Sequence, residues 1–408
     1  MIYPRYKIYN QQIFKSFFKK KIFIDELENK FIKFTNLKNI IFLNLARAGL
    51  FYAIKKITSD HKKEILLSPF TIFDVVNMII CAGGVPKFID TNLNSPHISK
   101  KNISENYSKN TAGVLITHYH NINPEIEEII NFCNSKNIKT IEDCAISLGG
   151  KYKNSLSSIG SKSDYAIYSF GIFKTVSTIS GGALYVKSYD EYNKIKSEIK
   201  LQKNSYKNLF FKLFNKLKFQ TFLNKKFFNI FFFHLIKFSE LYKIKNLNKY
   251  LKNDPDPKKI TNIPKKYLDK ISDYQIKEIF FQLDKYPALI DQRLKNALII
   301  EKNLKKNNNL ILPNIDYRTD TFHSYPVLIK NSQKEKLYNF LLKNNFDVSK
   351  YYYRNCSSLF EFSEYGSNCI NSEFYSSNVL NIPCYPELKE DYLERLCLKI
   401  NNYFINEN

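Results

Sequence analysis

The chain alternates between short apolar runs and longer helix-period stretches from residue 39 to residue 186. Runs rich in Ile, Leu, Val and Tyr predict strands at 40–43, 64–67, 87–89, 113–116, 138–141, 165–168 and 183–186. Apolar residues at helical spacing between these runs predict helices at 46–57, 73–81 and 124–136. Strands alternating with helices indicate an α/β fold with a mostly parallel sheet sandwiched by helices, and such sheets bind ligands at the carboxyl ends of their strands.

The pattern changes after residue 200. Lys and Phe dominate residues 200–260, where 15 Lys stand against three acidic residues, and this composition predicts an inserted helical segment over 200–262. Helical spacing returns further on, and a smaller C-terminal α/β domain is predicted from helices at 271–285, 288–306, 335–344 and 391–404 and a strand at 323–329. The chain is therefore divided into an N-terminal extension (1–37), a large domain (38–199), the insertion (200–262), and linking helices with the C-terminal domain (263–408).

The formal net charge of +24 has two interpretations. It could attract an acidic partner, or it could reflect coding bias, because Lys, Asn, Ile, Phe and Tyr are abundant while Trp is absent. No nucleic-acid-binding signature accompanies the charge, so we expect no nucleic-acid partner. The seven Cys include no C-x-x-C pair, which indicates neither a disulfide framework nor a zinc site, and we expect no metal.

The location of the protein follows from its apolar segments. Residues 1–21 are basic and aromatic but lack the apolar core of a secretory signal, and no run of about 18 apolar residues is present. We expect a cytoplasmic protein. The Lys- and Phe-rich stretch 200–260 leaves an alternative open, because it could form an amphipathic helix on an anionic membrane surface. It could equally pack on the body of the protein or against a second subunit.

Three groups with chemical potential stand at or just after strand ends. Asp143 follows the apolar strand at 138–141, and Ser169 follows the strand at 165–168. Lys174 comes five residues after Ser169 and precedes a Gly181-Gly182 turn. A lysine amine, a carboxylate and a hydroxyl are what pyridoxal phosphate (PLP) requires for its aldehyde, its pyridine nitrogen and its phosphate. Lys174 could then serve as general base and acid in a proton shift.

The order of these residues resembles the DegT/DnrJ/EryC1/StrS family of nucleotide-sugar aminotransferases. The family pattern E-D-A-A-x-x-x-G, G-x-x-x-D, S-F-x-x-x-K and G-G is similar to segments 142–149, 160–164, 169–174 and 181–182 of this chain. Supporting similarity lies at 44–50, where Ala46 and Arg47 occupy the phosphate-binding turn, and at 68–71, 82–86, 88–90 and 381–388. The likeness covers about residues 38 to 405, and its most specific part is the S-F-x-x-x-K segment with the upstream Glu-Asp.

The resemblance implies the aspartate aminotransferase fold (PLP fold type I), with the cofactor bound by the large domain. It implies that Lys174 holds the cofactor as a Schiff base, that Asp143 partners the pyridine nitrogen and that Ser169 contacts the phosphate. It also implies a nucleotide-sugar substrate, glutamate as the usual amino donor, and a homodimer with a site at the subunit interface. We expect an enzyme that makes an amino-sugar nucleotide for lipopolysaccharide or another surface polysaccharide.

The chain departs from the family pattern at a few positions. Ile146 stands where the family usually has Gln or His, Ile72 where an aromatic often stacks on the cofactor, and Ser180 where an acid precedes the Gly pair. The partner-supplied Asn-x-Arg loop has no clear match near 272–274. A low-activity member or a non-catalytic scaffold therefore remains an alternative. A related sugar dehydratase is a further alternative, against which Lys174 argues because those relatives carry His in its place.

Overall fold

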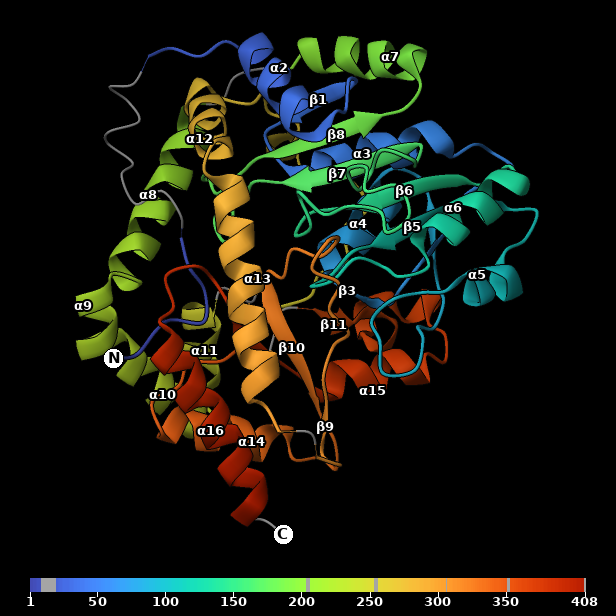
Figure 1. Cartoon of the computed structure of the whole chain (residues 1–408). Coiled ribbons are helices and arrows are strands. Elements are labelled where there is room, and N and C mark those ends of the chain that lie inside the picture. The colour runs from blue at the N-terminus through green and yellow to red at the C-terminus, as the bar shows by residue number, and fades with distance from the viewer. Residues whose placement is uncertain (9–19, 203–205, 253–255, 306, 351–352, 407–408) are drawn as a thin grey trace.

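The computed structural model describes residues 1–8, 20–202, 206–252, 256–305, 307–350 and 353–406. Its centre is a seven-stranded sheet in the order β1-β8-β7-β6-β5-β2-β4 (Figure 1). The strands are β1 (Ile40–Leu43), β2 (Glu64–Leu67), β4 (Val85–Phe88), β5 (Thr111–Thr117), β6 (Lys139–Asp143), β7 (Tyr165–Ser169) and β8 (Gly182–Val186). Strand β8 runs antiparallel to both of its neighbours, and the other strand pairs are parallel. The predicted mostly parallel α/β sheet is confirmed.

Helices cover both faces of this sheet. One face packs on α2 (Ile24–Thr35), α5 (Lys100–Asn106), α6 (Ile126–Ser135) and α12 (Asp273–Leu283), and the other on α3 (Ala46–Ile57), α4 (Phe73–Cys81) and α7 (Tyr189–Lys200). Successive strand residues point to opposite faces, so Ile40 and Phe42 of β1 join the first core while Ile41 and Leu43 join the second. This alternation also decides which strand-end side chains can meet.

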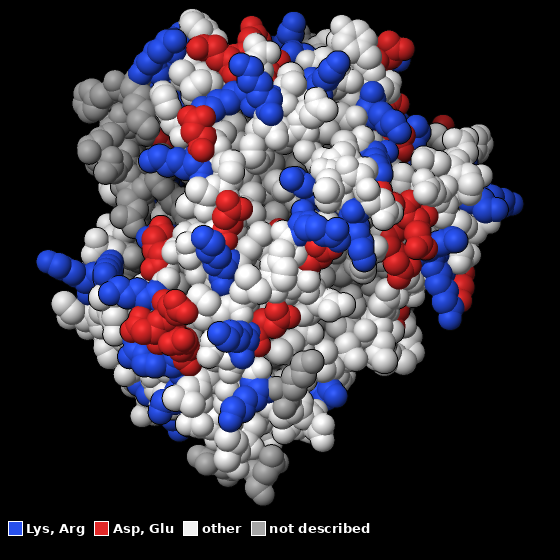
Figure 2. Space-filling model, viewed as in Figure 1, with Lys and Arg blue, Asp and Glu red and all other residues white. Residues whose placement is uncertain are grey.

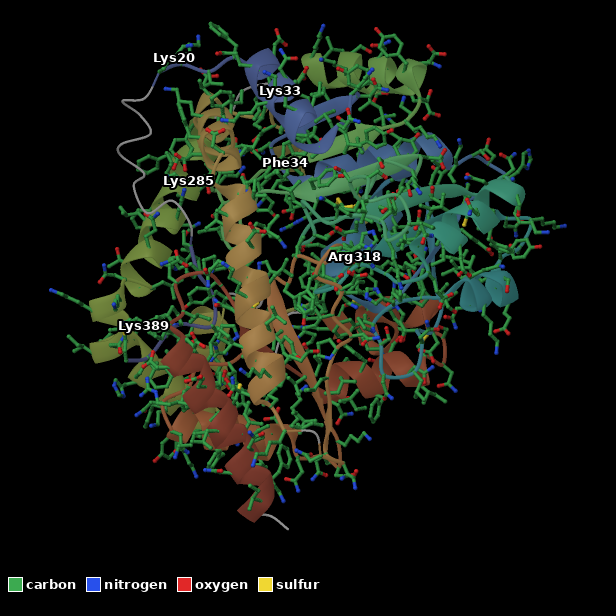
Figure 3. The ribbon with its side chains drawn as sticks, viewed as in Figure 1. Lys20, Lys33, Phe34, Lys285, Arg318 and Lys389 are labelled. Carbon is green, nitrogen blue, oxygen red and sulfur yellow. The ribbon has the colours of Figure 1, made fainter. Side chains whose placement is uncertain are left out.

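The C-terminal part forms a smaller antiparallel sheet with its own core. Its strands are β9 (Leu310–Ile311), β10 (Ser324–Ile329) and β12 (Val379–Pro383), and its helices are α13 (Tyr286–Asn303), α14 (Lys334–Lys343) and α16 (Glu390–Asn406). A short pairing of β3 (Phe70–Thr71) with β11 (Arg354–Asn355) links it to the large sheet region, and α15 (Ile370–Asn378) lies beside this pairing. Phe34 of α2, labelled in Figure 3, packs edge-on against the ring of Tyr286 at the start of the long α13, with the ring centroids 5.6 Å apart.

The Lys- and Phe-rich segment is helical in its described residues. It comprises α8 (Tyr206–Phe222), α9 (Lys225–Phe227), a π-helical turn (Phe228–Phe232), α10 (Phe233–Leu241) and α11 (Lys245–Lys252). Phe228, Phe232 and Phe233 are buried in the core of the C-terminal domain. Other apolar side chains of the segment are exposed, among them Phe210 (67%) and Phe214 (60%) of α8. None of the described helices is both long and apolar enough to span a bilayer.

The first residues of the chain pack against elements near its other end. The Tyr3 ring lies 4.7 Å from that of Tyr392 in α16, and the Arg5 guanidinium bonds the Asp347 carboxylate at 2.5 Å. On the face of the molecule shown in Figure 2, Lys and Arg are interspersed with Asp and Glu rather than gathered in one patch.

Candidate active site

A cavity of about 890 Å³ lies at the carboxyl ends of the central strands. It is lined by all five predicted site residues: Ala46, Arg47, Asp143, Ser169 and Lys174. They come from the start of α3, the last residues of β6 and β7, and the loop between β7 and β8. The cavity therefore lies at the edge of the sheet where the sequence predicts ligand binding.

Asp143 is the last residue of β6, and its carboxylate is open to the cavity while protein surrounds it elsewhere. Its Oδ1 accepts a hydrogen bond from the Ala145 N–H at 3.0 Å. Within the described chain, Oδ2 has no hydrogen-bond partner. Burial raises the pKa of Asp143, while the hydrogen bond from the Ala145 N–H and the nearby charge of Lys174 lower it. The carboxylate is thus held in a site that favours an additional positively charged or N–H partner.

Lys174 lies in the loop from 170 to 181, which is folded against the sheet. The Lys174 N–H donates to the Gly171 carbonyl at 2.9 Å, and the Thr178 N–H donates to the Phe170 carbonyl at 3.0 Å. His323 supports the same loop, since its Nε2 lies 2.9 Å from the Phe173 carbonyl oxygen and must carry the proton of that bond. Burial lowers the pKa of His323 most, and the nearby positive charges of Arg293 and Lys174 lower it further. The ring is therefore neutral. No sequence pattern predicted this contact, because it joins residues 150 positions apart. The strand expected at 323–329 begins at Ser324, so His323 lies just before it.

Gly182 brings the start of α3 close to the end of β7. It pairs with Leu43 of β1 and with Ser169 of β7. A Cβ atom at Gly182 would lie 2.4 Å from both the nitrogen and the Cα of Ala46, a distance no side chain tolerates. The Gly pair after Lys174 therefore allows the amino end of α3, which favours anions, to lie beside the Ser169 strand end.

Arg47 lines the cavity, but its guanidinium already has partners. Its NH1 lies 2.8 Å from Asp74 Oδ2 and donates to the Tyr267 hydroxyl at 2.9 Å. Asp74 stands in the first turn of α4. The suggested contact of Arg47 with a phosphate stays a prediction.

A second polar network lies beside the start of α3, and no sequence pattern predicted it. Asn44, which follows β1, receives hydrogen bonds on Oδ1 from Lys212 of α8 (2.6 Å), Gln275 of α12 (3.2 Å) and Ser180 (3.4 Å). Ser180 is the residue that replaces the family's acid before the Gly pair. Gln275 is 95 positions from Ser180 and 231 positions from Asn44 along the chain. No local sequence pattern could therefore predict that these residues meet.

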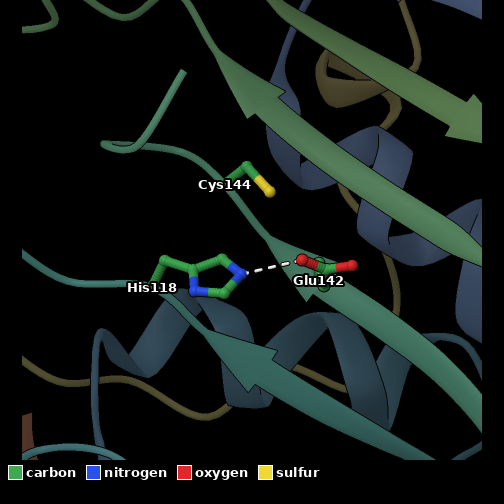
Figure 4. A group of neighbouring side chains, drawn as sticks. All are labelled: His118, Glu142 and Cys144. Atoms are coloured by element: carbon green, nitrogen blue, oxygen red, sulfur yellow. Dashed lines mark hydrogen bonds and ion pairs between the residues drawn. The ribbon is translucent and has the colours of Figure 1, made fainter. Parts of the chain in front are cut away.

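Glu142 occupies the opposite face of β6 from Asp143 and is fully buried with His118 and Cys144 (Figure 4). The three side chains are close enough to ligate one metal ion. However, the Glu142 oxygens accept from His118 Nε2 (2.8 Å), the Tyr152 hydroxyl (2.6 Å) and the Gly160 N–H (3.2 Å). The Asn123 N–H donates to His118 Nδ1 at 3.2 Å, so Nε2 carries the proton given to Glu142. The cluster is a satisfied hydrogen-bond network, and no lone pair of His118 is left for a metal.

Comparison with known proteins identifies the family. The sequence model of the DegT/DnrJ/EryC1/StrS aminotransferase family matches residues 9–215 and 267–401. The chain belongs to this family. The matched segments include every predicted site residue, and the family is one of PLP-dependent aminotransferases, so the expected family, fold and enzyme class are confirmed.

Relatives and solved structures agree with this assignment. The chain is 23% identical over 377 residues to the UDP-4-amino-4,6-dideoxy-N-acetyl-beta-L-altrosamine transaminase of Campylobacter jejuni subsp. jejuni serotype O:23/36 (strain 81-176), covering 90% of this chain and 85% of the relative. It is 25% identical over 172 residues to the GDP-perosamine synthase of Escherichia coli O157:H7, covering 42% and 47%. The fold is similar to that of Helicobacter pylori PseC, an aminotransferase involved in the biosynthesis of pseudoaminic acid, with a TM-score of 0.76, 16% identity and full coverage of both chains.

Proposed function

We propose that the protein transfers an amino group to a keto-sugar nucleotide, with PLP as cofactor and glutamate as donor, in the synthesis of a surface polysaccharide. The observation that carries the proposal is the single cavity shared by Lys174, Asp143, Ser169 and the start of α3. The Campylobacter and Escherichia relatives are named for UDP- and GDP-linked sugars, and this supports the substrate class.

The residues of the cavity fit this cofactor. Asp143 has a carboxylate oxygen without a hydrogen-bond partner in the described chain, and burial raises its pKa, so a cationic partner would stabilise its charged form. When bound, PLP supplies an electron sink that stabilises the charge left by a departing proton. Asp143 would hold the proton of the pyridine nitrogen. Lys174 would hold the cofactor through its amine and, once displaced by substrate, remove a proton from one carbon and return it to another.

The covalent role of Lys174 is testable by spectroscopy. The Lys174→Ala variant should lose the visible absorption of covalently held cofactor and all transfer activity, because no other amine is predicted to take its place. Lys153→Ala, at an exposed lysine after β6, is the matched control and should keep both. A wild-type protein that shows no cofactor band after incubation with PLP would instead support the non-catalytic scaffold.

The donor and the assembly are further parts of the proposal. Glutamate should convert the bound cofactor to its amine form, with loss of the visible absorption band. Amino acids that lack the side-chain carboxylate of glutamate should convert it less well. The family resemblance also supports a homodimer. Sedimentation should give twice the chain mass of 48.2 kDa, and a stable monomer that retains activity would overturn this part.

The insertion offers a surface for contact with an anionic membrane. Phe210, Phe214 and Leu217 are exposed at helical spacing on α8, within the Lys-rich stretch 200–260. Apolar side chains among basic ones suit an anionic lipid interface. Co-sedimentation with phosphatidylserine vesicles at low salt should fall in a Phe210→Ser, Phe214→Ser variant. If the wild type does not bind such vesicles, the surface packs against protein instead.

A further inference from the structure

Two lysines one turn apart on α8, Lys212 and Lys216, both turn into the protein. Lys216 is fully buried, and its Nζ lies 3.4 Å from Glu278 Oε2 and 3.2 Å from the Tyr274 hydroxyl. Both Lys216 and Glu278 are almost completely inaccessible, at 0% and 1%. Lys216 thus has a carboxylate of its own, as a buried ammonium requires.

Lys212 has no such partner. Its Nζ donates at 2.6 Å to Oδ1 of Asn44, a neutral amide, and no carboxylate lies within salt-bridge distance among the described residues. Burial lowers the pKa of Lys212 to about 8; Asp269 raises it, and the charges of Lys266 and Arg47 lower it further. Lys212 is therefore a half-buried cation in the field of two others, with a single acidic group at longer range.

The amide oxygen that accepts from Lys212 is shared with other donors. Oδ1 of Asn44 also lies 3.2 Å from Gln275 Nε2 and 3.4 Å from Ser180 Oγ, but Gln275 Nε2 makes a shorter bond of 2.6 Å to the Ser180 carbonyl. Asn44 comes directly before Leu45, the N-cap of α3. The Lys212 ammonium thus lies near the amino end of a helix without a carboxylate partner among the described residues, beside the cavity wall formed by Ala46, Arg47 and Lys266.

We propose that Lys212, together with the positive field of Lys266 and Arg47, binds a phosphate group at the start of α3 and supplies this contact from the same chain. The phosphate is that of the cofactor, so this inference rests on the proposed function. The diphosphate of the nucleotide sugar has the same chemistry, and the experiment separates the two sources. Ser180 in place of the family's acid is consistent with the site, because a carboxylate there would neutralise Lys212.

The test measures binding rather than turnover. Equilibrium dialysis of the apo protein at pH 7 would be carried out with PLP, with pyridoxal, which lacks the phosphate, and with uridine diphosphate. Variants are Lys212→Met, Lys212→Arg and Lys218→Met, the last at an exposed lysine of the same helix. Loss of one charge-assisted bond should weaken PLP binding by about ten-fold or more in Lys212→Met. Pyridoxal binding should stay unchanged, Lys212→Arg should restore most of the affinity, and Lys218→Met should match wild type.

Each outcome decides the inference. Weakened PLP binding with unchanged pyridoxal binding supports the cofactor phosphate as the ligand, and weakened diphosphate binding alone supports a phosphate site used by the substrate. Equal loss for PLP and pyridoxal, or no loss for any phosphate compound, overturns it. If wild type binds neither PLP nor pyridoxal, the proposed function fails, and the diphosphate measurement alone judges the Lys212 site. Circular dichroism of each variant, with Lys212→Arg as the conservative change, separates misfolding from lost binding.

Discussion

The two faces of β6 at its carboxyl end carry adjacent carboxylates in opposite circumstances. On one face, Glu142 accepts three hydrogen bonds and is shut away with His118 and Tyr152. On the other, Asp143 accepts one hydrogen bond from the chain and faces a cavity with Lys174. The alternation of the strand separates them completely. A carboxylate whose oxygens are all satisfied serves the fold, and one left with a spare oxygen in a cavity is available to a ligand.

The largest effect on stability should follow from removing Glu142, the carboxylate on the fully buried face of β6. Glu142→Ala removes the acceptor of two buried side-chain donors, and we expect a loss of about 3–5 kcal/mol in the free energy of unfolding. Urea denaturation of the apo protein measures this loss. The visible cofactor band of the protein that remains folded should be unchanged. A normal stability with a lost band would place Glu142 in the chemistry instead.

Asp143→Asn should give the opposite result. The amide cannot hold the proton of the pyridine nitrogen, so kcat should fall by about 100-fold or more, as for other removed electrostatic contacts in active sites. The apo protein should be as stable as wild type or slightly more stable at pH 7, because burial raises the pKa of this carboxyl and ionisation there opposes folding. A variant that unfolds like Glu142→Ala while keeping its kcat would erase the distinction between the faces.

A smaller effect is the pH dependence of stability that arises from two buried histidines, His97 and His120. Unlike His118, which bonds Glu142, neither has a hydrogen bond to a carboxylate among the described residues. Burial lowers the pKa of His97 to about 4 and that of His120 to about 3. Below pH 6.5 the unfolded chain binds protons that the folded chain does not, so each histidine should reduce stability as the pH falls. Between pH 6.5 and 4.5 this amounts to about 2 kcal/mol per histidine.

The His120→Asn variant tests this dependence. Its urea midpoint should fall less than that of wild type over the same pH range, although its stability at pH 7 is expected to be lower because the bond to Ser324 changes. His97 Nε2 lies 3.1 Å from Asn121 Oδ1 and His120 Nδ1 lies 3.0 Å from Ser324 Oγ, and neither of these partners titrates in this range. Identical pH slopes for wild type and variant would contradict the assignment of a neutral, buried His120.

Much of the large domain could be predicted because its signals are local. The helices at 46–57 and 73–81 were predicted with the bounds that α3 and α4 have, since apolar spacing marks both. The helix predicted at 124–136 begins only at Ile126, because Pro124 and Glu125 form the turn that precedes it. The direction of β8 was not predicted, because strand composition does not encode whether neighbours run parallel.

The site could be predicted as a set of residues but not as a geometry. Order along the chain placed Asp143, Ser169 and Lys174 at one sheet edge, and the structure brings them to one cavity. The contacts of Arg47 with Asp74 and of Lys212 with Asn44 depend on helices packed from elsewhere in the chain. The requirement for Gly182 likewise arises only when β8 and α3 are packed together.

The contact between Arg5 and Asp347 joins residues that are 342 positions apart. At a synthesis rate of 5–20 residues per second, Asp347 is made roughly 20–70 s after Arg5. Until then residues 1–8, with Arg5 and two tyrosines, lack the carboxylate of Asp347 that Arg5 bonds in the folded protein. The C-terminal domain can therefore complete its core only late in translation, whereas the strands from β1 to β8 can pair well before. During this delay the first eight residues of the nascent chain stay exposed, so proteases can cleave them and chaperones can bind them.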